Sequence, residues 1–246
     1  MRPDTRQSGT IQLYQSAEHR CAYLDGKRAR SLFVDPYRAK SMPLYEALID
    51  QGFRRSGEFI YRPNCPDCRQ CIPLRIAVDE FKPRRIQRRI WNRQQALFRV
   101  TEQAAGFDPA HYDLFRRYIQ SRHPNGEMAA TTEDGYAQFI SSSWSLSSSF
   151  AFYQDDKLIA VAVTDILRQG LSAVYTFFDP ELARLSLGVF CLLWQIEECK
   201  RRRLPWLYLG YWVPECRKMS YKSQYLPHEI FINGKWVRVQ ETDKSE

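Results

Sequence analysis

The pattern of apolar and polar residues changes along this chain of 246 residues. In the first eighty residues, short alternating or β-branched runs predict strands at 11–14, 31–34, 58–61 and 73–78 and one short helix at 44–51. The stretch Gly52-Phe-Arg-Arg-Ser-Gly57 separates that helix from the next strand and predicts a turn. The N-terminal third is therefore expected to be rich in short strands.

The pattern becomes helical from residue 83 to about residue 140, with breaks at 106–109 and 123–126. Residues 141–149 include seven serines, and we interpret them as a helix end followed by a surface loop. Strict alternation then predicts antiparallel strands at 150–153, 158–166 and 171–178, joined by turns at 154–157 and 168–170.

A longer helix is predicted at 186–202, where Val189, Leu192 and Ile196 form an apolar stripe, and Pro205 precedes a buried strand at 206–208. This order predicts an α+β fold with a GNAT-like acyltransferase sheet, by analogy of fold alone. We expect a smaller, strand-rich, cysteine-containing N-terminal domain at 1–81. Residues 82–246 then hold a basic helical segment and the GNAT-like transferase domain.

Composition narrows the class of protein. Apolar residues make up 44% and charged residues 26%, as in ordinary globular proteins. The longest apolar run is far shorter than the roughly 20 residues of a membrane span, and the first fifteen residues do not resemble a signal peptide. Seven cysteines argue against a secreted disulfide scaffold. We therefore expect a cytoplasmic protein with reduced thiols and no membrane partner.

The net charge of +8 is concentrated in residues 82–99, which contain seven basic side chains and no acidic one. Such a cluster favours a polyanion, because several cations displace counterions together, and Trp91 could stack on bases. The candidates for RNA contact are Arg84, Arg85, Arg88 and Arg89. The alternative is a solvated amphipathic helix that turns Ile86, Ile90 and Leu97 toward the core.

Three cysteines, Cys65, Cys68 and Cys71, are separated by two-residue gaps that let thiolates converge on one soft metal. Zinc would need a fourth ligand, for which Cys21 and His19 are candidates, and an iron–sulfur cluster is also open. The alternative is three thiols in a tight loop without a metal.

The segment before the long helix bears on the acyl donor. Acyl-CoA users of this fold hold pyrophosphate on a loop with small residues at the helix N-terminus. Here Phe190 stands at the last small position, four residues after Ser186. Because a bulky residue would hinder close backbone contact with phosphate, we do not expect coenzyme A. No P-loop or dinucleotide motif is present, so we predict no small-molecule cofactor.

Residues 208–222 combine aromatic residues, a glycine and cations directly after a central strand. Crevices for ligands open at such positions in sheets of this kind. The alternative is an aromatic loop that covers the core.

Many motifs in order resemble those of the arginyl-tRNA–protein transferases. They are His19-Arg-Cys21-Ala-Tyr-Leu24, Arg54-Arg-Ser-Gly57 with Tyr61-x-Pro63, the cysteine cluster with Pro73-Leu-Arg-Ile76, residues 175–180, Ser186-Leu-Gly188, and residues 208–222 with Pro227. The resemblance runs from about residue 10 to residue 237. The compact length and the cysteine patterns look like the bacterial branch, the aspartate/glutamate leucyltransferases.

This resemblance implies transfer of leucine from leucyl-tRNA to the α-amine of proteins that begin with Asp or Glu, which marks them for degradation. Leucyl-tRNA and such proteins are the expected partners, and DNA is not. Cys21, Cys65, Cys68 and Cys71 are expected to hold a structural zinc or iron–sulfur cluster.

The motifs shared by both branches contain cations suited to an acidic acceptor. The predicted acceptor-binding residues are Arg54, Arg55, Lys218, Tyr221 and Lys222. The alternative for the two arginines is that they brace the turn against a carboxylate such as Glu58. We predict that Asp179 polarises or deprotonates the attacking amine. The amides of Ser186 and Gly188 are expected to meet the RNA terminus or the oxyanion.

Two other classes of function stay open. One is an N-acyltransferase that uses a different activated donor. The other is a non-catalytic RNA-binding module stapled by a metal.

Overall fold

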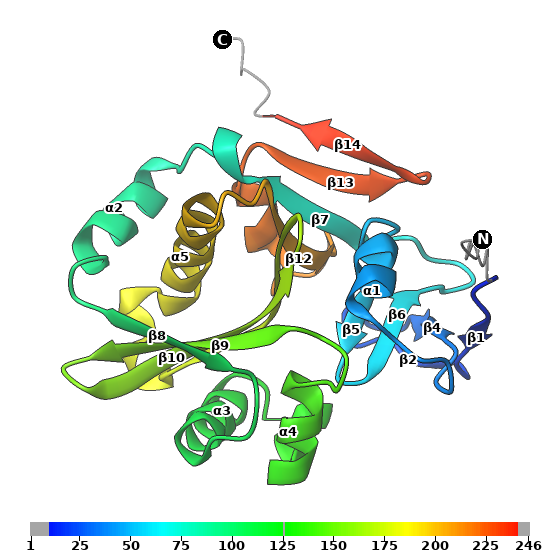
Figure 1. The fold of residues 1–246 in the computed structure, drawn as a ribbon, viewed down its shortest axis with the longest axis horizontal. Helices are drawn as coiled ribbons and strands as arrows, with labels where there is room; N and C mark the ends of the chain where they lie inside the picture. Colours follow the sequence, from blue (N-terminus) through cyan, green and yellow to red (C-terminus); the bar gives the residue numbers. More distant parts are fainter. Residues whose placement is uncertain (1–9, 125, 241–246) are drawn as a thin grey trace, which may run out of the picture.

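A computed structural model describes residues 10–124 and 126–240 and contains one large and two smaller sheets (Figure 1). The large sheet has eight strands in the order β14-β13-β7-β12-β11-β10-β9-β8. Its strands are β7 (Ile72–Ala77), β8 (Arg99–Ala104), β9 (Ser147–Gln154), β10 (Lys157–Leu167), β11 (Gly170–Phe178), β12 (Trp206–Trp212), β13 (His228–Ile232) and β14 (Lys235–Val239). Neighbours are antiparallel except β11 and β12, which are parallel.

Helices cover both faces of the large sheet (Figure 1). Helices α2 (Arg85–Gln94) and α5 (Leu187–Arg201) lie on one face, and α3 (Pro109–Arg122) and α4 (Glu133–Ile140) lie on the other. Successive side chains of β9 point to opposite faces of the sheet, so each face packs against its own pair of helices. Phe150 and Phe152 pack with Phe190 of α5, whereas Ala151 between them packs with Leu114 of α3 and Tyr136 of α4. The chain also contains the 3₁₀ helices η1 (Val78–Glu80), η2 (Glu127–Ala130), η3 (Pro180–Leu185) and η4 (Ser220–Gln224).

A four-stranded sheet in the order β1-β4-β6-β5 precedes the large sheet in the chain. Its strands are β1 (Leu13–Gln15), β4 (Ser31–Val34), β5 (Arg54–Ser56) and β6 (Phe59–Pro63). The separate pair β2 (His19–Arg20) and β3 (Arg28–Ala29) lies between β1 and β4 in the sequence, and helix α1 (Met42–Ile49) follows β4. Val34, Tyr45 and Ile60 share a core with Leu167 and Tyr208 of the large sheet. The two sheets are therefore packed together.

The predicted boundary at residue 81 does not coincide with an edge of either sheet. Strand β7 lies before that boundary and pairs with β12 and β13 inside the large sheet. Residues 1–9 and 241–246 of the two predicted domains lie outside the described residues.

The α+β class, the three strands after residue 150 and the helices α1 and α5 are confirmed. Helices α2, α3 and α4 lie in the region 83–140 that was predicted to be helical with two breaks, but the helical prediction is wrong for residues 99–104, which form β8. The predicted turn at 52–57 contains β5, and the serine-rich loop ends early because β9 begins at Ser147. No helix in the described ranges is long and apolar enough to span a bilayer.

Candidate functional site at the β11–β12 fork

The parallel strands β11 and β12 pair over a short distance and then part. Their paired positions are Gly170 with Trp206, Leu171 with Leu207, and Ser172 with Tyr208. Beyond them, residues 173–178 of β11 and 209–212 of β12 form what we call the fork. Residues 173–176 are half-exposed although they lie in the middle of the sheet. The fork therefore makes part of a central strand accessible to solvent.

At the point where β11 and β12 part, each of them also has a β-bulge in the ladder with its other neighbour, β10 for β11 and β7 for β12. Val174 has no opposite residue on β10, and Leu209 has none on β7. Gly210 follows in the left-handed region with a φ of +66°. Bulges leave main-chain groups outside the ladder and often lie next to active sites. Carbonyl groups on both sides of the fork therefore need other donors.

Arg54 of β5 supplies the donors on the β11 side. Its Nη2 donates to the carbonyl oxygens of Ala173 at 2.7 Å and Val174 at 3.4 Å. A Cβ at residue 210 would overlap the guanidinium, so Gly210 makes room for it. Arg54 is half-buried and forms no ion pair with any described residue. It is a cation that lacks an acidic partner.

Tyrosine hydroxyls lie near this guanidinium. Tyr211, whose ring centre is 6.0 Å from the Arg54 Cζ, donates to the Gly52 carbonyl at 3.0 Å. Burial and the neighbouring Tyr61 raise the pKa of Tyr23 to about 12, and Arg54 opposes that rise. These phenols are therefore neutral at pH 7 and available as hydrogen-bond donors.

Lys222 of η4 supplies the donors on the β12 side. Its Nζ donates to the carbonyl oxygens of Leu209 at 2.9 Å and Tyr211 at 2.5 Å, and the residue is 7% exposed. Burial and the nearby Arg54 lower its pKa to about 7. The fork thus holds two basic groups, the half-buried Arg54 and the buried Lys222.

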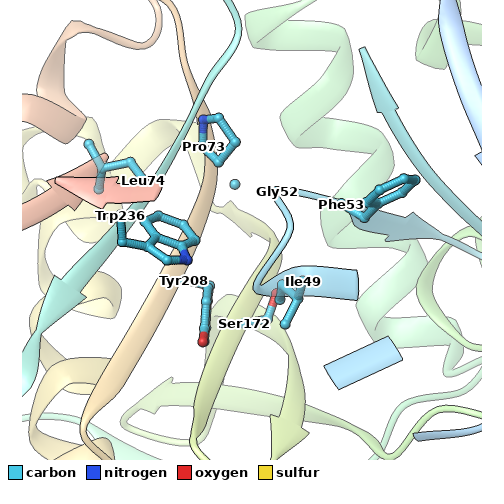
Figure 2. Close-up of a pocket in the computed structure, with 9 residues that line it drawn as sticks. Ile49, Gly52, Phe53, Pro73, Leu74, Ser172, Tyr208 and Trp236 are labelled. Atoms are coloured by element: carbon cyan, nitrogen blue, oxygen red, sulfur yellow. The ribbon is translucent and has the colours of Figure 1, made fainter. Parts of the chain in front are cut away.

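The cavity at the start of the fork is small. It has a volume of about 10 Å³ and is lined by residues that include Gly52, Ser172 and Tyr208. Figure 2 shows Ser172 and Tyr208 on neighbouring strands, with Ile49 facing them from α1. Since this volume holds one water at most, ligand contacts at the fork involve its half-exposed surface.

Arg55 has a different environment from its neighbour. Its Nε and Nη2 donate to Asp165 Oδ1 at 2.8 and 2.6 Å, and both side chains are fully buried. Ser147 and Tyr45 complete the hydrogen bonds of this carboxylate. The predicted acceptor role of Arg55 has no support in this arrangement, because its guanidinium has no exposed surface. It braces the fold, and its partner is Asp165 rather than Glu58.

The other predicted acceptor residues lie at the exposed side of η4 and the loop before it. Lys218 is exposed, with its Nζ 3.5 Å from His123 Nδ1. The ring of Tyr221 is 43% exposed, while burial of its hydroxyl and the nearby Tyr118 raise its pKa to about 12 against the effect of Arg54. The Tyr221 hydroxyl thus lies in the neighbourhood of Arg54.

Asp179 is fully buried at the end of β11. It forms ion pairs with Lys157 at 2.9 Å and Arg117 at 3.3 Å and accepts the Glu181 amide at 3.1 Å. Burial opposes its ionisation, but Lys157 and the Glu181 amide outweigh burial and lower its pKa. A carboxylate held in this way is a poor base, so these contacts do not support the predicted role of Asp179 in accepting a proton. It caps η3.

Ser186 is the N-cap residue of α5, and Gly188 lies in the first turn of that helix. Ser186 is in the left-handed region, and a Cβ at Gly188 would crowd the ring of Phe178. Phe190 is buried and stacks on Trp91, with ring centres 5.5 Å apart. Phe190 covers one face of the half-exposed Trp91 ring, so this contact gives no support to the expectation that Trp91 stacks on bases. The expected obstruction of the helix end by Phe190 also loses its steric basis, because that ring points into the core.

The arginines of α2 and Arg84, which precedes the helix, are exposed, whereas Gln87 and Gln94 are buried. Arg85, Arg89 and Arg93 form no ion pair within the described ranges. Ile86 and Leu97 are 55% and 56% exposed, whereas Ile90 packs against the core, so the alternative that turns all three toward the core is wrong for Ile86 and Leu97 and right for Ile90. The helix presents positive charge without local neutralisation.

The predicted metal ligands are gathered in one neighbourhood. Burial and the thiols of Cys65, Cys21 and Cys68 raise the pKa of Cys71 to about 12, and Cys216 also contributes. The described part of the chain contains no three His, Cys, Asp or Glu side chains already arranged around a metal position. Thiols are nevertheless the donor set that zinc and iron–sulfur clusters use, so the residues fit such a group chemically.

Sequence reasoning missed several residues around Arg54. Tyr23, Tyr61 and Tyr211 surround Arg54, and Gly210 makes room for it. The motifs contained all four, but the spacing alone did not indicate that β5 places its arginine against β11.

Two family models match the chain. The model of the arginine-tRNA-protein transferase N terminus matches residues 19–89, and the model of its C terminus matches residues 110–232. Together they include β5, the cysteine cluster, residues 85–89 of α2 and the whole fork.

Full-length relatives are also similar to the chain. The aspartate/glutamate leucyltransferase of Alcanivorax borkumensis is 48% identical over 236 residues, which covers 96% of this chain and 97% of the relative. The enzyme of the same name from Pseudomonas aeruginosa is 45% identical over 227 residues, with 92% and 96% covered. That from Hahella chejuensis is 43% identical over 230 residues, with 94% and 98% covered.

Among solved structures, the C-terminal domain of a putative lysylphosphatidylglycerol synthetase from Agrobacterium fabrum aligns with a TM-score of 0.44. It is 13% identical and covers 70% of this chain and 52% of that chain. A likeness this weak carries no argument.

Proposed function

The chain belongs to the arginine-tRNA-protein transferase family, and from that membership we propose that it transfers leucine from leucyl-tRNA to proteins that begin with Asp or Glu. The relatives that match nearly the whole chain carry the name aspartate/glutamate leucyltransferase, which supports both the donor and the acceptor. The modified proteins would be directed to degradation, and the cytoplasm, where aminoacyl-tRNA is made, is the proposed location.

The finer fold class that we propose is GNAT-like. Its support is the order of a three-strand meander, helix α5 and strand β12, with a parallel pair that parts in the middle of the sheet. The reaction still has to be argued from the site, since one fold serves many activities.

Arg54 is the proposed anchor for the acidic side chain of the acceptor, and the observation that carries this assignment is that no acidic residue in the described part of the chain pairs with it. A half-buried guanidinium with two carbonyl contacts still has donors for a carboxylate, and such charge-assisted bonds are strong. Lys218 and Tyr221 lie on the exposed side of the same region and are proposed to complete the acceptor site.

The exposed arginines Arg84, Arg85, Arg88 and Arg89 are the proposed tRNA contacts, because a row of cations neutralises successive phosphates. Gln94 of the same helix donates to the Leu185 carbonyl at 2.6 Å. This bond ties α2 to the segment before α5, where the amides of Ser186 and Gly188 are proposed to meet the RNA terminus or the oxyanion.

The reaction is aminolysis of an activated ester. A neutral α-amine attacks the ester carbonyl, and a tetrahedral oxyanion forms that needs hydrogen-bond donors. Correct placement of the amine beside the ester can supply most of the acceleration. In this proposal Arg54 binds the acidic side chain of the acceptor. The α-amine of the same acceptor residue then lies at a defined distance from the fork.

The cysteine cluster is proposed to hold one structural zinc ion or iron–sulfur cluster through Cys21, Cys65, Cys68 and Cys71. Such a group would tie the β2–β3 pair to the segment between β6 and β7, which is stabilisation rather than a step of the reaction. Elemental analysis of protein purified without oxygen should find about one metal site per chain, and an active, stable, metal-free preparation would exclude it.

The direct test is transfer of labelled leucine from purified leucyl-tRNA to peptides that begin with Asp, Glu or Ala. We expect label on the Asp and Glu peptides and much less on the Ala peptide. A panel with arginyl-tRNA tests the donor. An N-acyltransferase with another donor would give no label, and a non-catalytic RNA-binding module would bind the tRNA without discharging it.

The RNA surface has its own test. Arg88→Gln with Arg89→Gln should weaken binding of different tRNAs similarly and should lower the log–log salt slope by about one unit for each lost contact. Arg168→Gln, which removes an exposed cation from the β10–β11 turn, serves as the control. An unchanged slope in the α2 variant would assign these arginines to a solvated face.

A further inference from the structure

Lys222 occupies an unusual position for a lysine. It is 7% exposed, and its Nζ lies between the carbonyl oxygens of Leu209 and Tyr211 at 2.9 and 2.5 Å. These carbonyls flank Gly210, where the β12 bulge faces Arg54. The amine is therefore fixed at the floor of the fork rather than free on a flexible stem.

No carboxylate balances this amine among the residues that the structure describes. The titratable groups near enough to affect its pKa are Arg54 from β5, Cys71 from the segment before β7 and Cys216 from the segment after β12. Burial and the positive charge of Arg54 both disfavour the ammonium form, and together they lower the pKa of Lys222 to about 7. A substantial part of Lys222 is thus uncharged at neutral pH.

The uncharged form has the correct valences for this environment. A neutral amine has two N–H groups and one lone pair, and the two carbonyl oxygens accept both N–H groups. The lone pair is left free for a proton. A carboxylate-binding role, by contrast, would need the charged form and a third N–H directed at the ligand.

We propose that Lys222 Nζ accepts the proton from the α-ammonium group of the acceptor bound at Arg54. This inference rests on the proposed transfer function and adds the base that the reaction needs. The first proton of the ammonium passes to Nζ and later to solvent. The neutral nitrogen then forms the bond to the ester carbon, the bond from that carbon to the ribose oxygen breaks, and the second proton from nitrogen ends on that oxygen.

Other groups at or near the fork fit this task less well. Asp179 is held by Lys157 and Arg117 with a lowered pKa. Tyr23 and Tyr221 have pKa values raised to about 12, so they are not ionised at neutral pH. An α-amine has a pKa of about 7.7–8.0, and a general base is most effective when its own pKa lies near the working pH.

The decisive comparison uses Lys222→Arg and Lys222→Met beside Lys235→Met, which removes an exposed lysine from β14. Arginine keeps donors for both carbonyls but does not deprotonate. With saturating leucyl-tRNA and an Asp-starting peptide at pH 7, we expect both Lys222 variants to lose at least about tenfold in transfer rate, because without the base only about a tenth of an α-amine is neutral. Lys235→Met should match the parent protein.

A second acceptor separates proton transfer from positioning. In an Asp-like peptide whose terminal nitrogen is an aminooxy group, that nitrogen is already neutral at pH 7. The loss in both Lys222 variants should then shrink by at least tenfold relative to the ordinary peptide. An equal loss with both acceptors, or full activity in Lys222→Arg, would overturn the proposal and assign Lys222 to support of the bulge or to acceptor binding.

Two controls keep these outcomes distinct. Binding of leucyl-tRNA and the thermal unfolding midpoint show whether each variant is folded. If a Lys222 variant does not fold, carbon-13 NMR of ε-labelled lysine in the parent protein decides, because the proposal requires one lysine signal that titrates near pH 7. Failure of the parent protein to transfer leucine would reject the proposed function itself, whereas an active parent with an active Lys222→Arg rejects this inference alone.

Discussion

Arg54 and Arg55 are neighbours on β5, but their environments differ in one decisive respect. Arg55 is fully buried and paired with Asp165 at 2.6 Å, and the surrounding hydroxyls complete that carboxylate. Arg54 is half-buried and contacts main-chain carbonyls and tyrosines, with no acid among the described residues. Alternation along the strand sends the two side chains in opposite directions.

The comparison shows how to separate structural from functional charge in this molecule. A buried cation with an acidic partner has satisfied its electrostatic requirement inside the fold, and removing it leaves an unpaired charge. A cation with no such partner keeps its capacity for an external anion. The same criterion separates Asp179, which is doubly paired, from Lys222, whose contacts within residues 10–124 and 126–240 are with main-chain carbonyls.

The largest expected effect is a loss of stability when Arg55, the arginine that is paired with Asp165, is replaced. Arg55→Met should lower the free energy of unfolding by about 3–5 kcal/mol, because Asp165 is left buried without its partner. Urea unfolding measures this loss. Arg168→Met removes an ion pair with Glu46 in which the arginine is 79% exposed, and it should cost less than about 1 kcal/mol.

The double variant Arg55→Met with Asp165→Leu checks the cause. If an unpaired charge is responsible, removing both charges should recover most of the lost stability. A double variant as unstable as Arg55→Met would show that packing around the pair, rather than its charge, determines the loss.

A smaller effect is expected from Gly210→Ala, which acts on Arg54 from β12. The new methyl group would overlap the guanidinium and displace it, so transfer to Asp-starting peptides should fall by about tenfold or more, about 1.4 kcal/mol. Gly234→Ala has a similar positive φ but nothing within 4 Å, so it shares the backbone strain of about 1 kcal/mol without the overlap. Equal transfer by the two variants would contradict the placement of Arg54.

The smallest effect is a pH dependence of stability that comes from Lys222. Its pKa is about 7 in the fold against 10.5 for an ordinary lysine, so the unfolded chain binds more protons between these values. Stability should therefore rise with pH across this window, by about 1 kcal/mol between pH 6 and pH 8. The rise should be absent from Lys222→Met and retained by Lys235→Met, as measured by urea unfolding at each pH. A rise of equal size in both variants would place the titrating group elsewhere.

Elements with many buried apolar residues could be predicted from the sequence, whereas elements that are largely exposed could not. Helix α5 and strands β9 to β11 were predictable because buried apolar residues repeat at the right period, as with Phe150 and Phe152. Strand β8 was not, because it is a largely exposed edge strand whose sequence, Arg-Val-Thr-Glu-Gln-Ala, has a weak apolar pattern. Its pairing with β9 decides its structure, and a local pattern does not contain that information.

The site shows the same division. The motifs identified Arg54 and Lys222 as cations near an acceptor, but β5 is three residues long and was interpreted as a turn. Without that strand, nothing indicated that Arg54 and Arg55 point in opposite directions. Burial of Lys222 was also hidden, because its carbonyl partners become available through a bulge in β12.

The central claim is that Arg54 holds the acidic side chain of the acceptor, and Arg54→Met tests it most directly. We predict that kcat/KM for Asp- and Glu-starting peptides falls by roughly 30- to 4,000-fold, which corresponds to about 2–5 kcal/mol for a lost charge partner. Transfer to an Ala-starting peptide, binding of leucyl-tRNA and the free energy of unfolding should change far less. Equal losses for all three peptides, or a loss of stability as large as that of Arg55→Met, would contradict the account.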